Sequence, residues 1–257
     1  PDVIGLYNFD FVPDSFITSD YIAKIPEHWQ NWHKNPESSL SGRRLFTNLA
    51  ESKIASHGVQ YGCHRTKSRW PSSYSLSLPH RGSHLNLFIP GEYSEFTINF
   101  WLQKLYFSSA RQALIRPIAW GKLGQFSMEF SRAGEVQFYQ WAENAVQINR
   151  INNQKLGTQW QLLSYTFGKE KDGYKNKIFM NGNLLMEAKP TWTSKITMGE
   201  FTIGGFFASR GISHGNINCN IDEILILKKR WSEKEVKQYF KSGFPYHQME
   251  PDFFVKN

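Results

Sequence analysis

Short runs in which apolar and polar residues alternate recur along most of this chain. Residues 74–78, 83–89 and 95–102 alternate with a period of two, which is typical of strands that bury one face. Similar runs predict further strands at residues 4–10, 113–120, 125–131, 135–141, 159–169, 175–180, 183–187, 201–205 and 221–227. Many short strands separated by turn residues predict an all-β fold, a sandwich of two antiparallel sheets.

Two local signals stand out against this background. Asn181-Gly182 lies between two alternating runs, and this dipeptide favours a tight hairpin because both central residues of a type I′ turn need positive φ. Convincing helix patterns are nearly absent until Ser232 and Glu235, which form a capping box. A glycine at 243 and a proline at 245 then end the pattern, so we expect one short C-terminal helix.

Composition supports a large β fold. The chain has 257 residues, a length that a single sandwich can reach, and we expect one domain over residues 1–257. Aromatic residues make up 16% of the sequence, and flat rings pack well on a pleated surface.

The formal net charge is +8, which raises the question of a polyanionic partner. The lysines and arginines are scattered, with short groups at Arg43-Arg44 and at 228–230, and none forms a dense stripe. We therefore expect no nucleic-acid binding. No run approaches the ~20 apolar residues of a membrane helix, so we expect no membrane insertion of this segment.

The start of the chain resembles no targeting signal. It begins at Pro1 without a methionine and carries no signal peptide, which suggests that an upstream targeting segment has been removed.

Two cysteines, Cys63 and Cys219, are too few for a disulfide framework. Either they form one bridge that closes a long loop, or they are two buried free thiols. The sequence leaves both alternatives open.

The end of the chain resembles laminin-G-like jelly rolls of the concanavalin A-like superfamily. The resemblance is carried by residues 221–227, Trp231-Ser-Glu-Lys-Glu-Val236, Tyr239 and Gly243. Residues 7–10, 82–87, 95–101, 159–166, 179–184 and 201–204 match the family's other strands in the same order. The chain departs from the family at a loop-rich insertion of about residues 12–51 and at a C-terminal extension of about residues 246–257.

The resemblance implies a non-catalytic recognition module. Such domains commonly bind carbohydrate, or a cell-envelope or extracellular protein, as one part of a larger secreted or membrane-anchored protein. An extracellular, cell-surface or periplasmic location follows. The alternatives are a divergent glycoside hydrolase or polysaccharide lyase, since relatives in the superfamily are enzymes, and a structural spacer.

The aspartates and glutamates of the chain match no known arrangement of catalytic carboxylates. Glycoside hydrolysis needs two carboxylates facing each other across the sugar. Glu129 and Glu135 stand on separate predicted strands with a tight turn between them. We interpret them as solvated residues, and a cross-strand pair is the alternative. Asp222 and Glu223 are adjacent, so in a regular strand they point to opposite faces and cannot cooperate. Serine-hydrolase, zinc-helix and phosphate-loop motifs are absent from the sequence, so we expect no enzyme activity.

Calcium is the one cofactor that the resemblance suggests. In similar sandwiches a structural calcium ion ties the first strand to the last, and here Asp10, the backbone at Gly82 and Asp222 would bind it. The alternative is that Asp222 caps a loop or accepts backbone hydrogen bonds, while Asp10 is solvated. The dispersed histidines and Cys63 fit no closed zinc site.

Tryptophans are the candidate ligand-binding residues, because the apolar face of a sugar stacks on an indole ring. We expect Trp29, Trp32, Trp141 and Trp192 to contact the ligand. Trp29 and Trp32 lie in a polar stretch where no periodicity requires burial, which makes them the best candidates for an exposed pair. A lid folded over one sheet is the alternative for that stretch.

Overall fold

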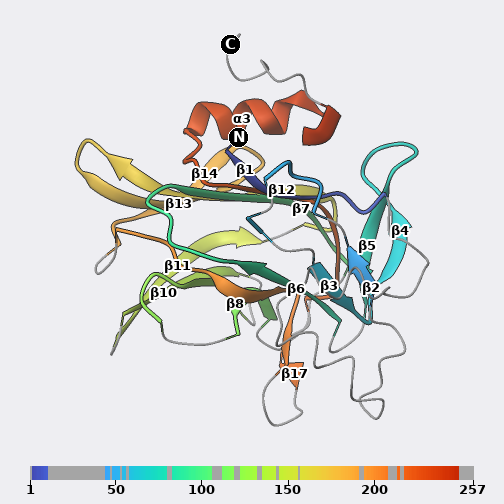
Figure 1. Cartoon of the computed structure of the whole chain (residues 1–257), viewed down its shortest axis with the longest axis horizontal. Helices are drawn as coiled ribbons and strands as arrows, with labels where there is room; N and C mark the ends of the chain where they lie inside the picture. The colour runs from blue at the N-terminus through green and yellow to red at the C-terminus, as the bar shows by residue number, and fades with distance from the viewer. Residues whose placement is uncertain are drawn as a thin grey trace.

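The computed structural model describes residues 2–10, 44–46, 48–52, 54–55, 58–79, 83–105, 112–118, 122–131, 135–142, 145–155, 157–190, 194–207, 213–214 and 217–248. These residues form two antiparallel sheets that pack face to face, with one α-helix against the outer side of one sheet (Figure 1). The predicted sandwich with a short C-terminal helix is confirmed.

The sheet next to the helix is called sheet A and has eight strands. Its strands follow the order β14, β13, β12, β7, β18, β5 and β4, and β1 pairs with β18 as well. The first described strand is thereby joined to the last. The strands are β1 Val3–Tyr7, β4 His64–Lys67, β5 Tyr74–Leu78, β7 Phe96–Lys104, β12 Trp160–Glu170, β13 Gly173–Met180, β14 Asn183–Ala188 and β18 Cys219–Leu227.

The facing sheet, sheet B, also has eight strands, in the order β11, β10, β9, β8, β15, β6, β3 and β2. A short separate hairpin pairs β16 (Phe206–Phe207) with β17 (Ser213–His214). The strands of sheet B are β2 Arg44–Phe46, β3 Gly58–Tyr61, β6 His84–Ile89, β8 Gln112–Pro117, β9 Phe126–Phe130, β10 Glu135–Ala142, β11 Ala145–Lys155 and β15 Gly199–Ile203.

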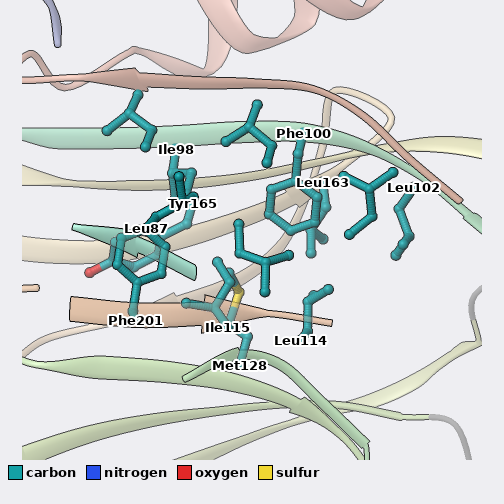
Figure 2. Close-up of a cluster of buried hydrophobic side chains, with 14 of the residues drawn as sticks. Leu87, Ile98, Phe100, Leu102, Leu114, Ile115, Met128, Leu163, Tyr165 and Phe201 are labelled. Carbon is teal, nitrogen blue, oxygen red and sulfur yellow. The ribbon is translucent and has the colours of Figure 1, made fainter. Parts of the chain in front are cut away.

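The core lies between the two sheets, where alternate residues of each strand meet. In β7 the side chains of Ile98, Phe100 and Leu102 point inward, as the period-two pattern predicts. They meet side chains of sheet B that include Leu87 and Phe201 (Figure 2). Each such side chain, once fully buried, stabilises the fold by about 1.5–3 kcal/mol.

The predicted hairpin is confirmed at the turn between β13 and β14. Asn181 has a φ of 51° and Gly182 a φ of 77°, the positive values that a type I′ turn needs. A side chain at position 182 would also approach the Cα atom of Lys237 to 3.1 Å. The turn therefore lies directly against the C-terminal helix.

Helix α3 spans Glu233–Ser242 and begins as the sequence predicts. The side chain of Ser232 accepts a hydrogen bond from the backbone N–H of Glu235, and the Glu235 carboxylate accepts one from the N–H of Ser232 at 2.7 Å. At the other end Gly243 has a φ of 71°, the left-handed conformation that glycine adopts most readily. Both ends of the helix are thus fixed by local sequence.

The predicted insertion and extension lie largely outside the described residues. Of the extension, Tyr246–Gln248 forms one 3₁₀ turn, and Tyr246 packs against Trp231 and Tyr239. Of the insertion, β2 and residues 48–51 are described. A single domain with these two additions remains a prediction.

Candidate functional site

The outer face of sheet A is closed by helix α3. Val236 and Tyr239 of the helix are fully buried against an apolar layer that includes Trp101, Leu162 and Leu225. Figure 1 shows the helix lying along the sheet on this side. A ligand therefore finds little open surface beneath the helix.

Two buried carboxylates lie under the same helix. The pairing of β18 with β7 shifts register between Asp222 and Leu225, and Glu223 adopts a φ of 38°. Asp222 pairs with Trp101 and so shares its outward face, while Glu223 accepts a hydrogen bond from the hydroxyl of Tyr239 at 2.8 Å. The prediction that these carboxylates point to opposite faces is wrong, because the extra residue of a bulge breaks the alternation.

This pair is an anchor for the C-terminal segment. Asp222 is 1% exposed and Glu223 is 0% exposed, so neither meets solvent. Burial raises the pKa of Asp222 to about 8, although a hydrogen bond from Ser68 opposes the shift. Glu223 also accepts from the backbone N–H of Tyr246 at 2.8 Å, which ties the 3₁₀ turn to β18.

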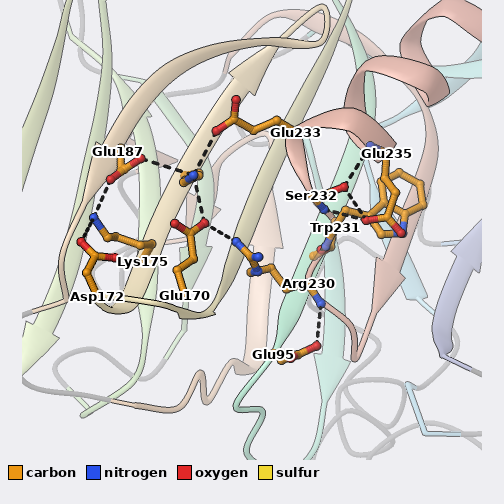
Figure 3. Close-up of polar contacts among 12 residues, drawn as sticks. Glu95, Glu170, Asp172, Lys175, Glu187, Arg230, Trp231, Ser232, Glu233 and Glu235 are labelled. Atoms are coloured by element: carbon orange, nitrogen blue, oxygen red, sulfur yellow. Dashed lines mark hydrogen bonds and ion pairs between the residues drawn. The ribbon is translucent and has the colours of Figure 1, made fainter.

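Ion pairs form a second link between the helix and sheet A (Figure 3). The ammonium group of Lys177 lies 2.9 Å from the carboxylate of Glu170, 3.0 Å from that of Glu233 and 3.3 Å from that of Glu187. Burial alone would lower the pKa of Lys177, but the hydrogen bonds that its ammonium group donates to these three carboxylates outweigh burial and raise the pKa. Because its charges are mutually paired, this network is better suited to holding the helix than to binding a ligand.

The two candidate calcium ligands that are described lie at one hairpin, the turn between β4 and β5. Asp10 accepts hydrogen bonds from Ser73 Oγ at 2.6 Å and from the N–H of Tyr74 at 2.8 Å. Asp222 accepts from Ser68 Oγ and from the N–H of Glu223. This matches the alternative in which Asp222 takes hydrogen bonds.

No third ligand joins them: within the described ranges, histidine, cysteine and carboxylate side chains form no group of three that could hold a metal ion. Gly82 lies outside the described residues. Calcium binding therefore remains a prediction.

The outer face of sheet B has a different character. In the strands of sheet B the residues that point into the core are apolar, such as Phe126, Met128 and Phe138. The residues that point to the outer face are mostly polar or aromatic. Cross-strand pairs place them on one surface across five strands. The outward residues include His84 and Asn86 of β6, Arg116 of β8, Ser127 and Glu129 of β9, Gln137, Tyr139 and Trp141 of β10, and Thr202 of β15.

Tyr139 and Trp141 form an aromatic pair on this face. Their ring centroids are 6.4 Å apart and their planes are within 19° of parallel. The hydroxyl of Tyr139 donates a hydrogen bond to Gln137 at 2.7 Å. The two residues are 7% and 8% exposed, so both are buried and neither forms an open platform. Ligand binding by Trp141 stays a prediction.

Polar groups on the next strand lie beside this pair. Ser127 is directly opposite Tyr139 in the register, and its buried hydroxyl has no hydrogen-bond partner. Glu129 forms a buried ion pair with Arg116 at 3.2 Å. It is opposite Gln137, so the sequence-based alternative of a Glu129–Glu135 cross-strand pair is not formed, and its interpretation as a solvated residue is wrong.

The remaining predicted ligand-binding residues, Trp29, Trp32 and Trp192, lie outside the described residues. The structure thus places one of the four, Trp141, and adds neighbours that the sequence analysis did not select. Ser127 and Gln137 carry no motif. Only their alternation with Phe126, Met128 and Phe138 could have placed them on the face of Trp141.

The two cysteines are free thiols. Cys219 pairs with Leu78 of β5, while Ser77 of β5 pairs with His64, the residue after Cys63. Strand β5 therefore separates them by two strand spacings, about 9–10 Å. A disulfide needs Cα atoms within about 7 Å, so the free-thiol alternative holds.

The described part of the chain contains no helix long and apolar enough to cross a membrane.

Comparisons with known proteins bear on the fold. No protein-family model matches the sequence, and no curated protein matches it either. Solved structures do match. The binding domain of Paraclostridial Mosquitocidal Protein 1 superposes with a TM-score of 0.60 at 12% identity, over 94% of this chain and 52% of that one.

Two further matches come from botulinum neurotoxins. A structure described as showing that cell entry of type C depends on interaction with two ganglioside molecules has a TM-score of 0.55 at 15% identity, over 78% of this chain and 49% of that one. The type DC binding domain in complex with SialylT has a TM-score of 0.55 at 14% identity, over 78% and 49%.

This chain spans about half the length of these solved structures. Identity this low shows a shared fold and nothing finer. The sandwich is thus the fold of part of several solved binding domains.

Proposed function

We propose that this chain is a non-catalytic recognition module that binds carbohydrate through the outer face of sheet B. The observation that carries the proposal is the unpaired hydroxyl of Ser127 beside the rings of Tyr139 and Trp141. Buried polar groups in proteins nearly always have a hydrogen-bond partner. A sugar hydroxyl would supply the missing partner, and the aromatic edges would contact the apolar side of the sugar.

The composition of the two outer faces supports this choice. Sheet A carries helix α3 and an apolar layer on its outer face, whereas the outer face of sheet B carries amide, hydroxyl, guanidinium and carboxylate groups, each on a residue at most 9% exposed. Ligand sites combine aromatic surface with a few placed polar groups. Trp29, Trp32 and Trp192 belong to this proposal as further contacts to the glycan.

The solved structures that match this chain support the same class of function. Two of the matching structures are described as binding a ganglioside or in complex with SialylT, and all three named above are binding domains or concern cell entry. We extend to this chain the general role of recognition at a cell surface. An extracellular, cell-surface or periplasmic location, protein partners and a place among laminin-G-like domains belong to the proposal as well.

A divergent glycoside hydrolase or lyase is the competing function. It requires two carboxylates facing each other across an open surface. The adjacent carboxylates of this chain, Asp222 and Glu223, are instead buried under α3, and Glu129 is held by Arg116. A spacer without a ligand is the third candidate, and a glycan-binding measurement separates it from the other two.

Two serines give a matched test. Ser127 and Ser164 are both 0% exposed and both carry an unpaired hydroxyl, but Ser127 is on the outer face of sheet B and Ser164 is on the outer face of sheet A. Ser127→Ala and Ser164→Ala therefore remove the same group from opposite sides of the sandwich.

On a glycan array followed by calorimetry, we expect Ser127→Ala to weaken binding of the best glycan about fivefold to tenfold, the value of about one hydrogen bond. Ser164→Ala should leave affinity unchanged. Neither variant should lower the melting temperature, because the lost hydroxyl has no partner to lose. Equal affinities for all three proteins, or no glycan bound at all, would reject the proposed face.

A further inference from the structure

We propose that the β4–β5 hairpin carries a second binding site, which takes the sulfate or carboxylate groups of an anionic polysaccharide. The site lies on sheet A, so it is separate from the aromatic face of sheet B. Anion binding at this site does not depend on carbohydrate binding at sheet B. Three residues form it: Arg65, Lys67 and Tyr74.

The register of the hairpin gathers these side chains on one face. Lys67 pairs directly with Tyr74, and Arg65 pairs with Leu76, two residues further along β5. Tyr74 and Leu76 are separated by two positions, so the four residues share the face on which Leu76 joins the core, and the other three lie at the exposed margin of that face. Arg65, Lys67 and Tyr74 are exposed, and Tyr74 is 43% exposed.

The arginine is held in place before any ligand arrives. Its guanidinium carbon lies 3.5 Å from the centroid of the Tyr74 ring, a cation–π contact. One of its terminal nitrogens donates a hydrogen bond to the backbone carbonyl of Asp10. A guanidinium has five N–H donors, so most of them stay available for an anion in a fixed orientation.

The two cations of the hairpin differ from Lys177 in how they are paired. Among the described residues neither Arg65 nor Lys67 forms an ion pair, in contrast to Lys177 with its three carboxylates. The carboxylate of Asp10 accepts hydrogen bonds from Ser73 Oγ and from the N–H of Tyr74. Arg65 and Lys67 are both exposed, so an anion in solution can reach them.

The arrangement suits a polymer better than a single small anion. Arg65 and Lys67 stand about 7 Å apart along one strand, which matches a ligand with several negative groups on one chain. Strand β4 is an edge strand of sheet A, so a long ligand can extend past it. The exposed ring of Tyr74 adds an apolar surface against which a sugar ring can pack.

The test compares two double variants with the same change of charge and the same spacing. Arg65→Gln with Lys67→Gln removes the site. Lys169→Gln with Lys171→Gln removes two exposed lysines from the far end of sheet A, at the turn between β12 and β13. The probes are heparin, hyaluronan, neutral dextran and vesicles that contain an anionic phospholipid, with affinity measured by calorimetry at two salt concentrations.

We expect heparin or hyaluronan to bind the natural protein, and the first double variant to bind about tenfold more weakly, since each exposed charge contact is worth about threefold. The second double variant should bind as the natural protein does. Binding should weaken as salt rises, and dextran should not bind.

Three outcomes would overturn the proposal: no binding of either polyanion, equal weakening by both double variants, or hairpin-dependent binding of anionic lipid vesicles alone. Ser127→Ala serves as the cross-check. It should keep heparin affinity while losing affinity for the glycan found on the array, so failure of either site can be told from failure of the other.

Discussion

Asp222 and Glu223 are consecutive residues of β18, yet both side chains lie on the outer face of sheet A. The register shift against β7 and the left-handed φ of 38° at Glu223 make this arrangement possible. The consequence is a pair of buried carboxylates that connects the hairpin serine Ser68 on one side with Tyr239 and Tyr246 on the other.

The first prediction concerns pH. The pKa of Asp222 rises from 3.8 to about 8 because of burial, so between these values the folded protein holds a proton that the unfolded chain has lost. Its contribution to stability is therefore fully present below about pH 4 and falls as pH rises toward about 8. Asp222→Asn should unfold at a higher urea concentration than the natural protein at pH 9, and at a similar one at pH 4.

One pKa unit corresponds to about 1.4 kcal/mol, so the difference in unfolding free energy at pH 9 should exceed about 1 kcal/mol. The control is Asp172→Asn, because the pKa of exposed Asp172 is lowered by hydrogen bonding to Lys175. If Asp222→Asn keeps the pH slope of the natural protein, the carboxylate is not buried in the way described.

The second prediction concerns the ion-pair network. Lys177→Met removes a nearly buried ammonium group and leaves three carboxylates without their shared partner. We expect a loss of about 2 kcal/mol in unfolding free energy, the usual value for hydrogen bonds between charged groups. Lys189→Met, which changes an exposed lysine paired with Asp172, should cost less than about 0.5 kcal/mol. Equal losses in urea unfolding would show that the network does not hold the helix.

Sequence patterns determined the fold to the extent that they were local. The alternation in β7, the turn at Asn181-Gly182 and the cap at Ser232 each follow from residues close together in the chain, and all three are confirmed. Strand β11 was not predicted. It is an edge strand of sheet B and is rich in asparagine and glutamine, and its apolar residues Val146, Ile148 and Ile151 do not keep a spacing of two.

The sites were harder to predict because they depend on register across strands. Nothing in the sequence of residues 221–227 marks the bulge at Glu223, and strict alternation placed one of the two carboxylates on the wrong face of the sheet. Buried Lys104 is a similar case: it donates to Gln112 at 2.7 Å and to the carbonyl of Ile217, and burial lowers its pKa to about 8. Only the packed structure brings these three residues together.

A third prediction concerns the two tryptophans proposed as an exposed pair. Trp29→Ala and Trp32→Ala should each weaken retention on the glycan that the natural protein binds, by about fivefold or more, since burial of part of an indole ring contributes about 1 kcal/mol or more. The melting temperature should change little. If either variant unfolds the protein, that tryptophan belongs to the core, and the binding role loses its basis.

The calcium hypothesis gives a fourth prediction. An ion between Asp10 and Asp222 would stabilise the folded protein by mass action, so its removal should lower the melting temperature by several degrees. Thermal unfolding with EGTA, and with EGTA plus excess calcium as the control, measures this. An unchanged melting temperature after EGTA would mean that hydrogen bonds alone hold the β4–β5 hairpin.

The central claim is that carbohydrate is bound, and left intact, at the outer face of sheet B. The most direct measurement is an NMR titration of the indole N–H signals with the best glycan from the array, followed by analysis of the recovered glycan. We predict that the Trp141 signal shifts, that the signals of Trp101 and Trp231 under helix α3 do not, and that the glycan is recovered at its original length. Shifts confined to Trp101 and Trp231, or a shortened glycan, would contradict the account.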